Sequence, residues 1–578
     1  MIEVDNKHIA QILNEIAIML SMDGNVSRFE IIAYKNAAKT IDELDRPVVQ
    51  IYEELGINGL MELDGVGKGI SANIESLILK GRLEKYEKLK VRYPIDFKNM
   101  LGLAGIGPKR LYVLYNKLGV VNIDGLKEAI AKHQIKNLDG FGERSEAALL
   151  KGISMLEASK GRILLGDAYP IAIKILESIR ASNTVDRAEI AGSIRRMKET
   201  IGDLDILATS KKPKDAIEFF VSMKEVKSVI AKGDTKATIW LDSNINCDLR
   251  VIEPESFGAA EQYFIGSKEH NVQVRKIAIK NKYKLNEYGL FKKSGKNLGI
   301  ETEKGIYEKL GMAYVPAEMR ENKGEIELAL AHKLPDIIEY GELLGDLHTH
   351  TIQSDGSASI EQMVDGAMKA NLKYIATTNH TKSLKIANGM DEKKCIEYFS
   401  NIDKLNERYD GKFRILKGAE VEILKDGRLD YDNSILKQMD FCIGGVHSYF
   451  NMPKEDMTKR IISAIESGYI HMLAHPTGRI IKQRDSYLVD MDRISQAAFD
   501  ANVLLEINAQ PSRLDLCDTN IMIASKYKVM FGISSDAHAV SDFELLRYGI
   551  GTARRGWVHK ENVANTRDID NFLKLINK

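Results

Sequence analysis

The stretch GSIRRMKETIGDLDI at residues 192–206 decides the fold expected for the first half of the chain. It starts with Gly192 and Ser193 ahead of a short helical run, and it ends with Asp203 and Asp205 on an apolar run. Residues two apart on a strand face the same side of a sheet, so both carboxylates can hold the same divalent ions. Backbone N–H groups at a glycine turn before a helix suit a phosphate. The stretch therefore predicts a strand-and-helix unit that handles a phosphate ester.

Neighbouring segments complete this expected site. The unit contains short β-rich runs at 187–191, 204–208, 238–241 and 246–252. Such runs among helical segments are typical of an α+β fold. Asp248 lies on the last run and supplies a third carboxylate, and Arg196 adds positive charge for a triphosphate. Three carboxylates with two divalent ions suit phosphoryl transfer. An isolated Asp-x-Asp pair is more often a solvated strand end, but the fixed spacing from Gly192 and Ser193 favours a catalytic site.

Residues 1–160 are predicted to be helical and contain three copies of one glycine turn. The copies are LDGVG at 63–67, LAGIG at 103–107 and LDGFG at 138–142. One such turn is as often an ordinary connection between helices. Three within 80 residues resemble helix-hairpin-helix elements, which bind the DNA backbone without reading its sequence. The glycines expected to approach phosphates are Gly65, Gly67, Gly105, Gly107, Gly140 and Gly142.

The chain from residue 343 onward alternates short apolar runs with helical stretches. Seven candidate strands lie at 343–347, 372–378, 414–423, 441–446, 470–474, 503–507 and 529–533. Regular alternation of strand and helix predicts a parallel barrel, here a distorted (β/α)7 barrel. In such a barrel the carboxyl ends of the strands meet at one mouth.

Metal-binding residue types are concentrated at these strand ends. Eight of the twelve histidines lie after residue 347, and six of them fall at or just after a predicted strand. The expected ligands are His348, His350, Asp355, His380, Glu420, His447, His475, Asp536 and His538. Any one of these histidines alone is more often structural, as we expect for His471 and His559. Nine N and O ligands at one mouth predict two or three transition-metal ions.

Composition limits the other properties of the chain. Its 82 Lys and Arg balance 82 Asp and Glu, so nucleic-acid binding must come from local patches such as 268–296, which holds nine basic and two acidic residues. The four cysteines form no CxxC pair and predict reduced thiols. No segment approaches the roughly 18 apolar residues of a membrane span. We expect a cytoplasmic monomer without a signal peptide or a membrane partner.

The first 322 residues resemble a family X DNA polymerase of the prokaryotic type. The resemblance rests on the Gly-Ser-x-x-Arg and Gly-Asp-x-Asp pattern, on YFIGSKEHN at 263–271 followed by Arg275, and on YVPAEMRE at 314–321. It implies gap filling in DNA repair, of the base-excision kind, on gapped or primed DNA with dNTPs and Mg²⁺ or Mn²⁺. It places Tyr263 and Phe264 near the incoming sugar, and Asn271 and Arg275 near the nascent base pair and template. The implied dNTP contacts are Gly192, Ser193, Arg196, Tyr263, Phe264, Gly266, Ser267, Asn271 and Arg275.

Residues 343–578 resemble a PHP (polymerase and histidinol phosphatase) domain, including Ala474-His475-Pro476 and Asn508-Ala509. The resemblance implies hydrolysis of phosphate esters, here as a 3′–5′ exonuclease and 3′-end-processing activity. It implies Mn²⁺, with Zn²⁺ or Fe²⁺ equally compatible with the ligands. Asn379 stands where an Asp before the His is common. We expect it to support the ligands rather than to bind metal.

The two resemblances together divide the chain into six parts. They are a helical DNA-end-binding domain with the first hairpin at 1–95, a second helix-hairpin-helix subdomain at 96–160, a nucleotidyltransferase palm at 161–255, a thumb for nucleotide selection at 256–322, a linker at 323–342 and a PHP metallophosphoesterase domain at 343–578.

One activity of the polymerase family is not expected here. Some members use a lysine after the first hairpin as a Schiff-base nucleophile that removes a 5′-deoxyribose phosphate. Spacing from Gly65-Val66-Gly67 aligns Asn73 with that lysine, and an amide cannot form the imine. Lys68 and Lys80 are nearby amines that nothing in the sequence favours.

Two other functions stay open at this point. An untemplated nucleotidyltransferase would share the fold, but the three hairpins and the pattern at Asn271 and Arg275 count against it. A non-catalytic DNA-end-binding protein would have no use for the intact acids Asp203, Asp205 and Asp248.

Overall fold

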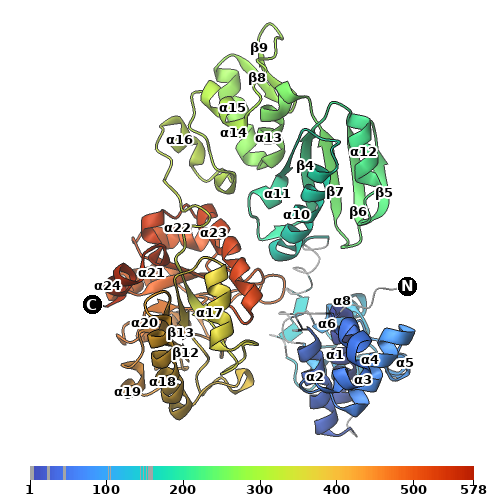
Figure 1. Ribbon diagram of the computed structural model, residues 1–578, viewed down its shortest axis with the longest axis vertical. Helices are drawn as coiled ribbons and strands as arrows, with labels where there is room; N and C mark the ends of the chain where they lie inside the picture. Colours follow the sequence, from blue (N-terminus) through green and yellow to red (C-terminus); the bar gives the residue numbers. More distant parts are fainter. Residues whose placement is uncertain are drawn as a thin grey trace. The chain divides into compact units, whose positions relative to one another are not determined.

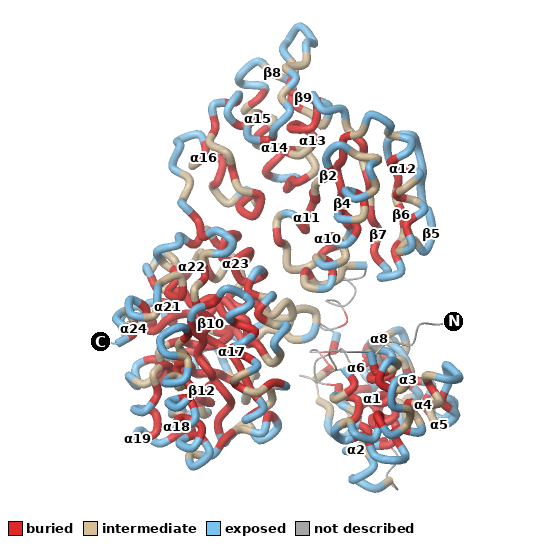
Figure 2. Tube along the Cα trace, in the orientation of Figure 1, coloured by how far each residue is buried: buried red, intermediate tan, exposed pale blue. Residues whose placement is uncertain are grey.

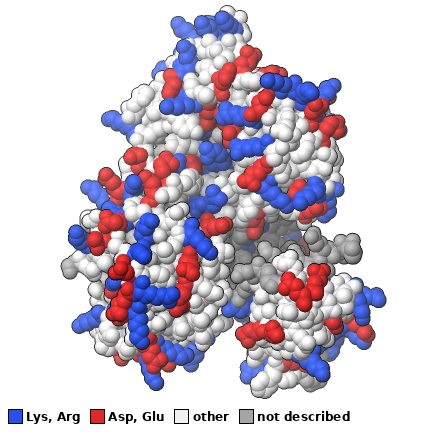
Figure 3. Space-filling model, in the orientation of Figure 1, with Lys and Arg blue, Asp and Glu red and all other residues white. Residues whose placement is uncertain are grey.

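A computed structural model describes residues 6–577, apart from 23–25, 43, 45–46, 102, 104–105, 143–144, 147–148, 151–152 and 154–160 (Figure 1). The chain forms two compact units. The first comprises Met1–Lys160 with Lys482–Arg484, and the second comprises Gly161–Ile481 with Asp485–Lys578. Basic and acidic side chains are interspersed over the face shown in Figure 3.

The first unit is helical, as expected. Its helices are α1 (Asn6–Met22), α2 (Arg28–Asp42), α3 (Val48–Met61), α4 (Lys68–Lys80), α5 (Glu84–Arg92), α6 (Phe97–Leu101), α7 (Pro108–Leu118) and α8 (Ile123–Ala131). The apolar period in α1 buries Ile9, Leu13 and Ile16 completely in one hydrophobic core. Short helices such as these are marginally stable alone, and the burial of their apolar side chains in a shared core stabilises them.

The second unit begins with a five-stranded sheet that forms the palm. Its strands are β2 (Arg187–Ala191), β4 (Asp203–Thr209), β7 (Asn246–Val251), β6 (Lys236–Leu241) and β5 (Val226–Lys232), in that order across the sheet. Strands β4 and β7 are parallel, and the other neighbours are antiparallel. Helices α10 (Leu165–Ala181) and α12 (Pro213–Val221) share a hydrophobic core with the sheet. The edge strand β5 was not predicted, because most of its residues are exposed and it lacks an apolar alternation.

The thumb follows the palm. It contains α13 (Phe257–Ile265), α14 (Lys268–Lys280), the hairpin β8 (Tyr283–Asn286) and β9 (Gly289–Lys292), and α15 (Glu303–Lys309). Helix α16 (Glu325–Leu330) lies in the segment expected to be a linker, yet Ile326 and Ala329 are buried in the thumb core. Glu325 Oε1 lies 2.7 Å from Nδ1 of the buried His270. The connecting segment is therefore packed against the thumb.

The C-terminal part is a nearly closed barrel of seven parallel strands, which confirms the expected (β/α)7 fold. The strands are β10 (Gly345–Thr349), β11 (Tyr374–Thr377), β12 (Arg414–Glu422), β13 (Phe441–Gly445), β14 (Met472–Leu473), β15 (Leu504–Asn508) and β16 (Phe531–Ser534), neighbours in chain order. A parallel bridge between Thr349 and Ala537 joins the first strand to the segment after the last. All seven predicted strands are present.

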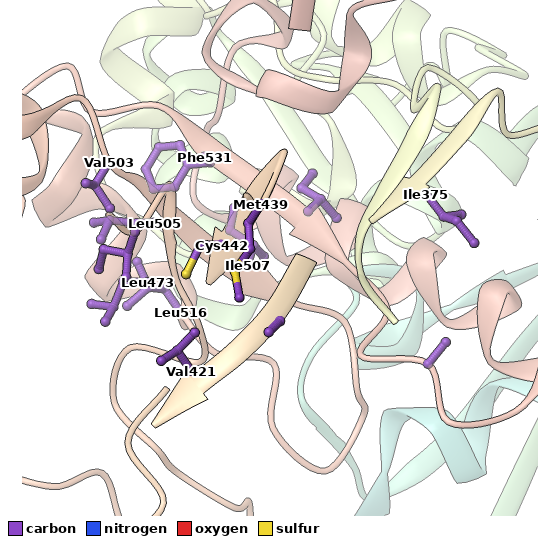
Figure 4. Packing of buried hydrophobic residues seen from close by; sticks show 14 of the residues in the cluster. Ile375, Val421, Met439, Cys442, Leu473, Val503, Leu505, Ile507, Leu516 and Phe531 are labelled. Carbon is purple, nitrogen blue, oxygen red and sulfur yellow. The ribbon is translucent and has the colours of Figure 1, made fainter. Parts of the chain in front are cut away.

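Helices surround this barrel, and the strands inside them are buried (Figure 2). The helices are α17 (Ile360–Lys369), α18 (Glu392–Tyr409), α19 (Asn433–Leu436), α20 (Lys454–Ile465), α21 (Met491–Ala501), α22 (Asp518–Ser525), α23 (Leu546–Arg555) and α24 (Ile569–Ile576). One core lies between strands and helices and includes Val421, Cys442 and Leu473 (Figure 4). A second core includes Phe441 and Phe572, so α24 contributes to it.

Two sequence expectations concern the whole chain. The four cysteines are free thiols, three of them buried. Within the described residues, no helix combines the length and apolarity that crossing a membrane requires.

Candidate active sites

The first candidate site is formed by acids on adjacent palm strands. In the parallel pair β4 and β7, Asp205 stands beside Asp248, and Asp203 stands beside Asn246. Asp203 and Asp205 face the same side because they are two residues apart. Burial, followed by repulsion from Asp203 and Asp248, raises the pKa of Asp205 to about 6. The three carboxylates therefore lie close enough to repel one another, an arrangement that divalent cations stabilise.

Positive side chains partly neutralise this cluster. Lys236 Nζ lies 3.2 Å and an Arg250 guanidinium nitrogen 3.3 Å from Asp248 Oδ2. The Arg250 guanidinium also lies 4.5 Å from the centre of the Phe264 ring. Sequence reasoning assigned no role to these two cations, although both flank Asp248 on its own or the neighbouring strand.

Gly192 requires a glycine for two reasons. Its φ is +69°, and a Cβ there would lie 2.4 Å from Asp205 Oδ2. The turn therefore runs directly against the carboxylate, before the short helix α11 (Gly192–Arg195). The hydroxyl of Ser193 is buried and has no hydrogen-bond partner among the described residues. A buried hydroxyl without a partner beside a carboxylate cluster fits a phosphate oxygen.

A cavity of about 580 Å³ connects the palm and the thumb. All nine residues predicted to contact the nucleotide line it, together with Asp203 and Asp205. Sequence reasoning missed further lining residues, which are Arg162, Lys198, Lys268, Glu269 and Glu321. Asp248 is not among the lining residues and lies beside Asp205 on the adjacent strand β7.

Arg196 lines this cavity and forms an ion pair with Glu321, which also lines it. Arg196 Nε is 3.2 Å from Glu321 Oε1, and the guanidinium also donates to the Ile265 carbonyl. Lys198 Nζ lies 3.3 Å from the second oxygen of Glu321. The sequence predicted only a phosphate as the partner of Arg196. In the structure a carboxylate holds its guanidinium.

The side chain of Asn271 is held by hydrogen bonds within the thumb. Its Nδ2 donates to the Tyr263 carbonyl at 2.7 Å, and its Oδ1 accepts from Gln262 Nε2 at 2.7 Å. The Tyr263 and Phe264 rings meet edge to face with centroids 5.0 Å apart. These contacts fix the orientation of the amide and the two rings that the sequence placed near the nucleotide.

The second candidate site lies at the mouth of the barrel, where the nine predicted ligands meet. Glu420 is central. Its Oε1 lies 2.8 Å from His475 Nε2 and 3.0 Å from His447 Nε2. Its Oε2 lies 3.1 Å from His380 Nδ1 and 3.3 Å from His348 Nε2. One buried carboxylate is thus surrounded by four imidazoles contributed by four strand ends.

Two further acids extend the cluster. Asp536 Oδ1 is 3.3 Å from His350 Nε2, and Asp355 Oδ2 is 3.4 Å from His538 Nε2. In three groups of residues, the ligand atoms lie within 4.8 Å of one another. The first group is His350, Asp355, His380 and His538; the second is His348, His350 and Asp536; the third is His380, Glu420 and His447. Three overlapping groups fit two or three ions.

The unpaired nitrogens of the cluster test whether metal ions fit. Nε2 of His348, both ring nitrogens of His350, Nδ1 of His380 and Nδ1 of His475 are buried without a hydrogen bond in the described part of the chain. Burial, with His538 and His380 nearby, lowers the pKa of His350 to about 3. A neutral imidazole with unpaired nitrogens beside carboxylates is the donor set that transition metals prefer.

Carboxylates behind the ligands orient them, and sequence reasoning missed these. Glu506 Oε1 lies 2.7 Å from His348 Nδ1, and Glu422 Oε2 lies 2.7 Å from His447 Nδ1. Asn508 donates to Asp536 Oδ2 at 3.0 Å. The spacing could have indicated Glu422, because it lies two residues after Glu420 on the same strand and so faces the same side.

Asn379 lies beside the cluster. Its Oδ1 accepts from the Thr351 backbone N–H at 2.8 Å and from Ser354 Oγ at 2.9 Å. It therefore holds the loop that carries Asp355. His471 lies outside the metal groups, where its Nδ1 accepts from the Cys442 N–H at 2.9 Å, and His559 pairs in a bridge with Ile337.

The first two glycine turns of the first unit precede helices as expected, and the third is followed by residues that the structure describes only in part. Gly67 and Gly107 occupy the N-cap positions of α4 and α7. Gly65 has φ +70° and lies against Asn36. Within the described residues, the surroundings are open at four predicted positions, which are Gly67, Gly107, Gly140 and Gly142. Gly105 lies outside the described residues.

Asn73 lies on α4 and donates to the Tyr34 hydroxyl at 2.6 Å. The side-chain amide that spacing aligns with the nucleophilic lysine is thus engaged in a hydrogen bond with a neighbouring helix.

Comparisons with known proteins cover nearly the whole chain. Residues 4–83 match the helix-hairpin-helix domain family, 260–321 the DNA polymerase beta thumb and 346–510 the PHP domain. The chain is 34% identical over 574 residues to the DNA polymerase/3′-5′ exonuclease PolX of Bacillus subtilis (strain 168), covering 98% of this chain and 99% of that relative. It is 31% identical over 236 residues to a probable phosphatase of Thermoanaerobacter sp. (strain X514), covering 39% of this chain and 91% of the phosphatase. The chain therefore belongs to the family X DNA polymerases that carry a C-terminal PHP domain.

Proposed function

We propose that the chain fills gaps in primed DNA by template-directed synthesis and cleans 3′ ends by metal-dependent phosphodiester hydrolysis. The observation that carries this proposal is the presence of two separate ion-binding clusters, one of carboxylates beside a cavity and one rich in imidazole. The full-length similarity to a DNA polymerase/3′-5′ exonuclease supports both activities.

The palm site carries the synthesis reaction. Asp203, Asp205 and Asp248 would hold two ions, which we propose to be Mg²⁺ or Mn²⁺. When bound, such ions activate the primer 3′-hydroxyl and neutralise the triphosphate. The Ser193 hydroxyl binds a phosphate oxygen, because it is buried and has no hydrogen-bond partner among the described residues. The N–H groups at the start of α11 bind further phosphate oxygens, because no side chain caps this helix start.

The remaining cavity residues select the nucleotide. We assign the phosphates to Arg196, Gly192 and Ser193, and the sugar to Tyr263 and Phe264. We assign the nascent base pair and template strand to Asn271 and Arg275, and further contacts with the nucleotide to Gly266 and Ser267, which line the same cavity. Asn271 enters the cavity already oriented by two hydrogen bonds, so little entropy is lost on binding.

The PHP site carries hydrolysis. Its nine ligands would hold two or three ions, which we propose to be Mn²⁺, Zn²⁺ or Fe²⁺. When bound, these ions supply a nucleophile at neutral pH and neutralise the scissile phosphate. Glu506 and Glu422 keep His348 and His447 in the tautomer that presents Nε2 to the cluster. We assign Asn379 a supporting role, because its Oδ1 accepts hydrogen bonds from Thr351 and Ser354 in the loop that carries Asp355.

DNA enters through local contacts rather than overall charge. The open glycines at the starts of α4 and α7 allow a phosphate to approach the backbone N–H groups. We assign the parts of the chain as the sequence suggested, with a palm at 161–255, a thumb at 256–322 and a PHP domain from 343, and we propose a monomer. Asn73 gives no support for a lyase reaction by the usual route.

Incubation with a one-nucleotide gap and a single dNTP tests the synthesis reaction. Extension only by the dNTP complementary to the template base is expected, and extension by all four would identify an untemplated transferase. A mismatched 3′ end in the same gap tests hydrolysis. Its removal before extension is expected with Mn²⁺, and its persistence would contradict the 3′-processing role.

A further inference from the structure

The PHP domain contacts the palm segment that links the phosphate turn to the catalytic acids. Arg555 of α23 donates from NH1 to the Arg196 carbonyl at 2.9 Å. Gly551, one turn earlier on α23, packs so tightly on Met197 that a Cβ would lie 2.7 Å from its side chain. The chain at Arg196 and Met197 is therefore held by a helix of the other enzyme domain.

The hydrophobic contact between the two domains continues into the palm core. Leu514 and Tyr548 of the PHP domain belong to the same buried cluster as the palm helices and sheet. Arg479 of the PHP domain lies 2.6 Å from Glu199, at the end of the same palm segment. The segment 196–199 thus has PHP partners at its beginning, middle and end.

Arg555 also shares a carboxylate with Arg196. Its NH1 lies 3.1 Å from Glu321 Oε1, the oxygen that is 3.2 Å from Arg196 Nε. Burial raises the pKa of Glu321, but Arg555, Lys198 and Arg196 hold that pKa below its ordinary value. Glu321 is therefore a charged group whose attraction is divided among three cations.

Arg555 is itself fixed. Its other terminal nitrogen, NH2, lies 2.6 Å from Asp518 Oδ2 on α22, and the residue is 4% exposed. Lys323 Nζ lies 3.1 Å from the same Asp518 oxygen. A buried guanidinium that bridges two carboxylates and a carbonyl has little freedom to move, so it fixes the groups that it binds.

These contacts have a consequence for nucleotide binding. Arg196 lines the dNTP cavity, but its guanidinium is paired with Glu321, so a triphosphate must compete with that carboxylate. Arg555 supplies Glu321 with an alternative partner and holds the Arg196 backbone in place. Without Arg555, Glu321 would attract Arg196 more strongly and away from the triphosphate.

We propose that Arg555, a residue of the PHP domain, is a positioning residue of the polymerase site that keeps Arg196 available for the incoming triphosphate. The inference rests on the proposed polymerase function. It makes the hydrolase domain part of the nucleotide-binding apparatus, in addition to its own chemistry.

The adjacent residue provides a matched control. Arg554 lies on the same helix, is almost equally buried and crosses the same domain boundary. Its Nε is 3.0 Å from Glu318 Oε1, and its NH1 donates to the Ile338 carbonyl at 2.7 Å. Neither partner lines the dNTP cavity. A general loosening of the boundary should follow from either substitution, whereas the proposed effect belongs to Arg555 alone.

The test compares full-length Arg555→Met and Arg554→Met in single-nucleotide gap filling, with 3′ degradation of single-stranded DNA measured in parallel. For Arg555→Met we expect KM for the dNTP to rise about 10-fold, with kcat changed less than about 3-fold, because a charge-assisted contact of the bound nucleotide is weakened. Arg554→Met should leave KM within about 2-fold of the wild type. Degradation should be unchanged in both variants.

A rescue variant separates positioning from simple damage. Adding Glu321→Gln to Arg555→Met removes the competing charge and should lower KM again, which two independent lesions would not do. If Arg555→Met does not fold, Arg555→Lys replaces it, because it keeps the charge and loses the bridging geometry, with an expected KM rise of about 3-fold.

Three results would overturn the inference, namely an unchanged KM in the Arg555 variant, an equal rise in the Arg554 variant, or no rescue by Glu321→Gln. Failure of the polymerase function itself looks different, because the wild-type protein would then neither extend the primer nor bind a fluorescent dNTP in the presence of Mg²⁺.

Discussion

The palm site and the PHP site both concentrate acidic or imidazole side chains, but they do so in different surroundings. Two palm acids line a cavity, the exposed Asp203 and the half-buried Asp205, and Asp248 is half-buried beside Asp205. The PHP ligands His348, His350 and Glu420 are buried and lie among further carboxylates. We expect ions held by a few half-exposed carboxylates to exchange with the solvent and with the nucleotide, and a buried imidazole cluster to retain its ions. The comparison therefore predicts visiting ions at the palm site and resident ions at the PHP site.

The largest expected effect separates the two sites completely. Replacement of Asp203, Asp205 and Asp248 by Ala should abolish gap filling while 3′ degradation continues. Replacement of His348 and His350 by Ala should do the reverse, because each change removes the ligands of one cluster only. Primer extension and degradation assays on both variants measure this. Loss of both activities in either variant would mean that the two clusters are not independent.

Chelation and reloading test the difference between visiting and resident ions. After prolonged dialysis against a chelator, Mg²⁺ alone should restore synthesis, because oxygen ligands suit that ion. Degradation should stay absent until Mn²⁺ or another transition metal is added, since imidazole ligands favour those ions. Metal analysis before and after dialysis gives the retained ions. Equal recovery of both activities with Mg²⁺ would remove the distinction.

A smaller effect is expected from the carboxylate behind the PHP ligands. Glu506→Gln keeps the shape but weakens the contact with His348 Nδ1, so metal affinity should fall about 10- to 100-fold. Competition with a fluorescent chelator measures the affinity. Glu455→Gln, on the exposed surface of α20, is the control and should change nothing. An unchanged affinity for Glu506→Gln would show that His348 needs no orienting group.

The smallest effect concerns protons. Without ions, the carboxylates around them outweigh burial and raise the pKa values of His447 and His538 to about 9. Both rings are therefore protonated at pH 7, and each must release a proton to bind metal. Metal affinity of the PHP site should then increase as pH rises from 6 to 9. In the palm, the pKa of Asp205 near 6 predicts that Mg²⁺ affinity increases only up to about pH 7. Calorimetry in buffers of different ionisation enthalpy measures the release, and the absence of proton release at pH 7 would contradict it.

Much of the fold and of both sites was predictable because the signals are local. The strand ends carrying His380, His447 and His475 follow apolar runs of the right length, and parallel strands must bring such ends together. Likewise Asp203 and Asp205 reveal their common face through their spacing. These features depend only on the alternation of neighbouring residues.

The missed features depend on distant partners or on absent patterns. Glu321 and Arg555 meet across 234 positions of sequence, so no local period connects them. Glu506 orients His348 although the two residues are 158 positions apart in the sequence. The edge strand β5 is formed by hydrogen bonding to β6, while its mostly exposed residues lack the alternation that reveals a half-buried strand.

The core shared between palm and barrel has a consequence for how the protein is made. Leu514 and Tyr548 complete the palm core, yet ribosomes synthesise them long after the last palm strand. Until then the nascent palm exposes an apolar surface that has no cover of its own. Truncated products that end before α23 should therefore aggregate or require chaperones, and the N-terminal half expressed by itself should be less soluble than the whole chain.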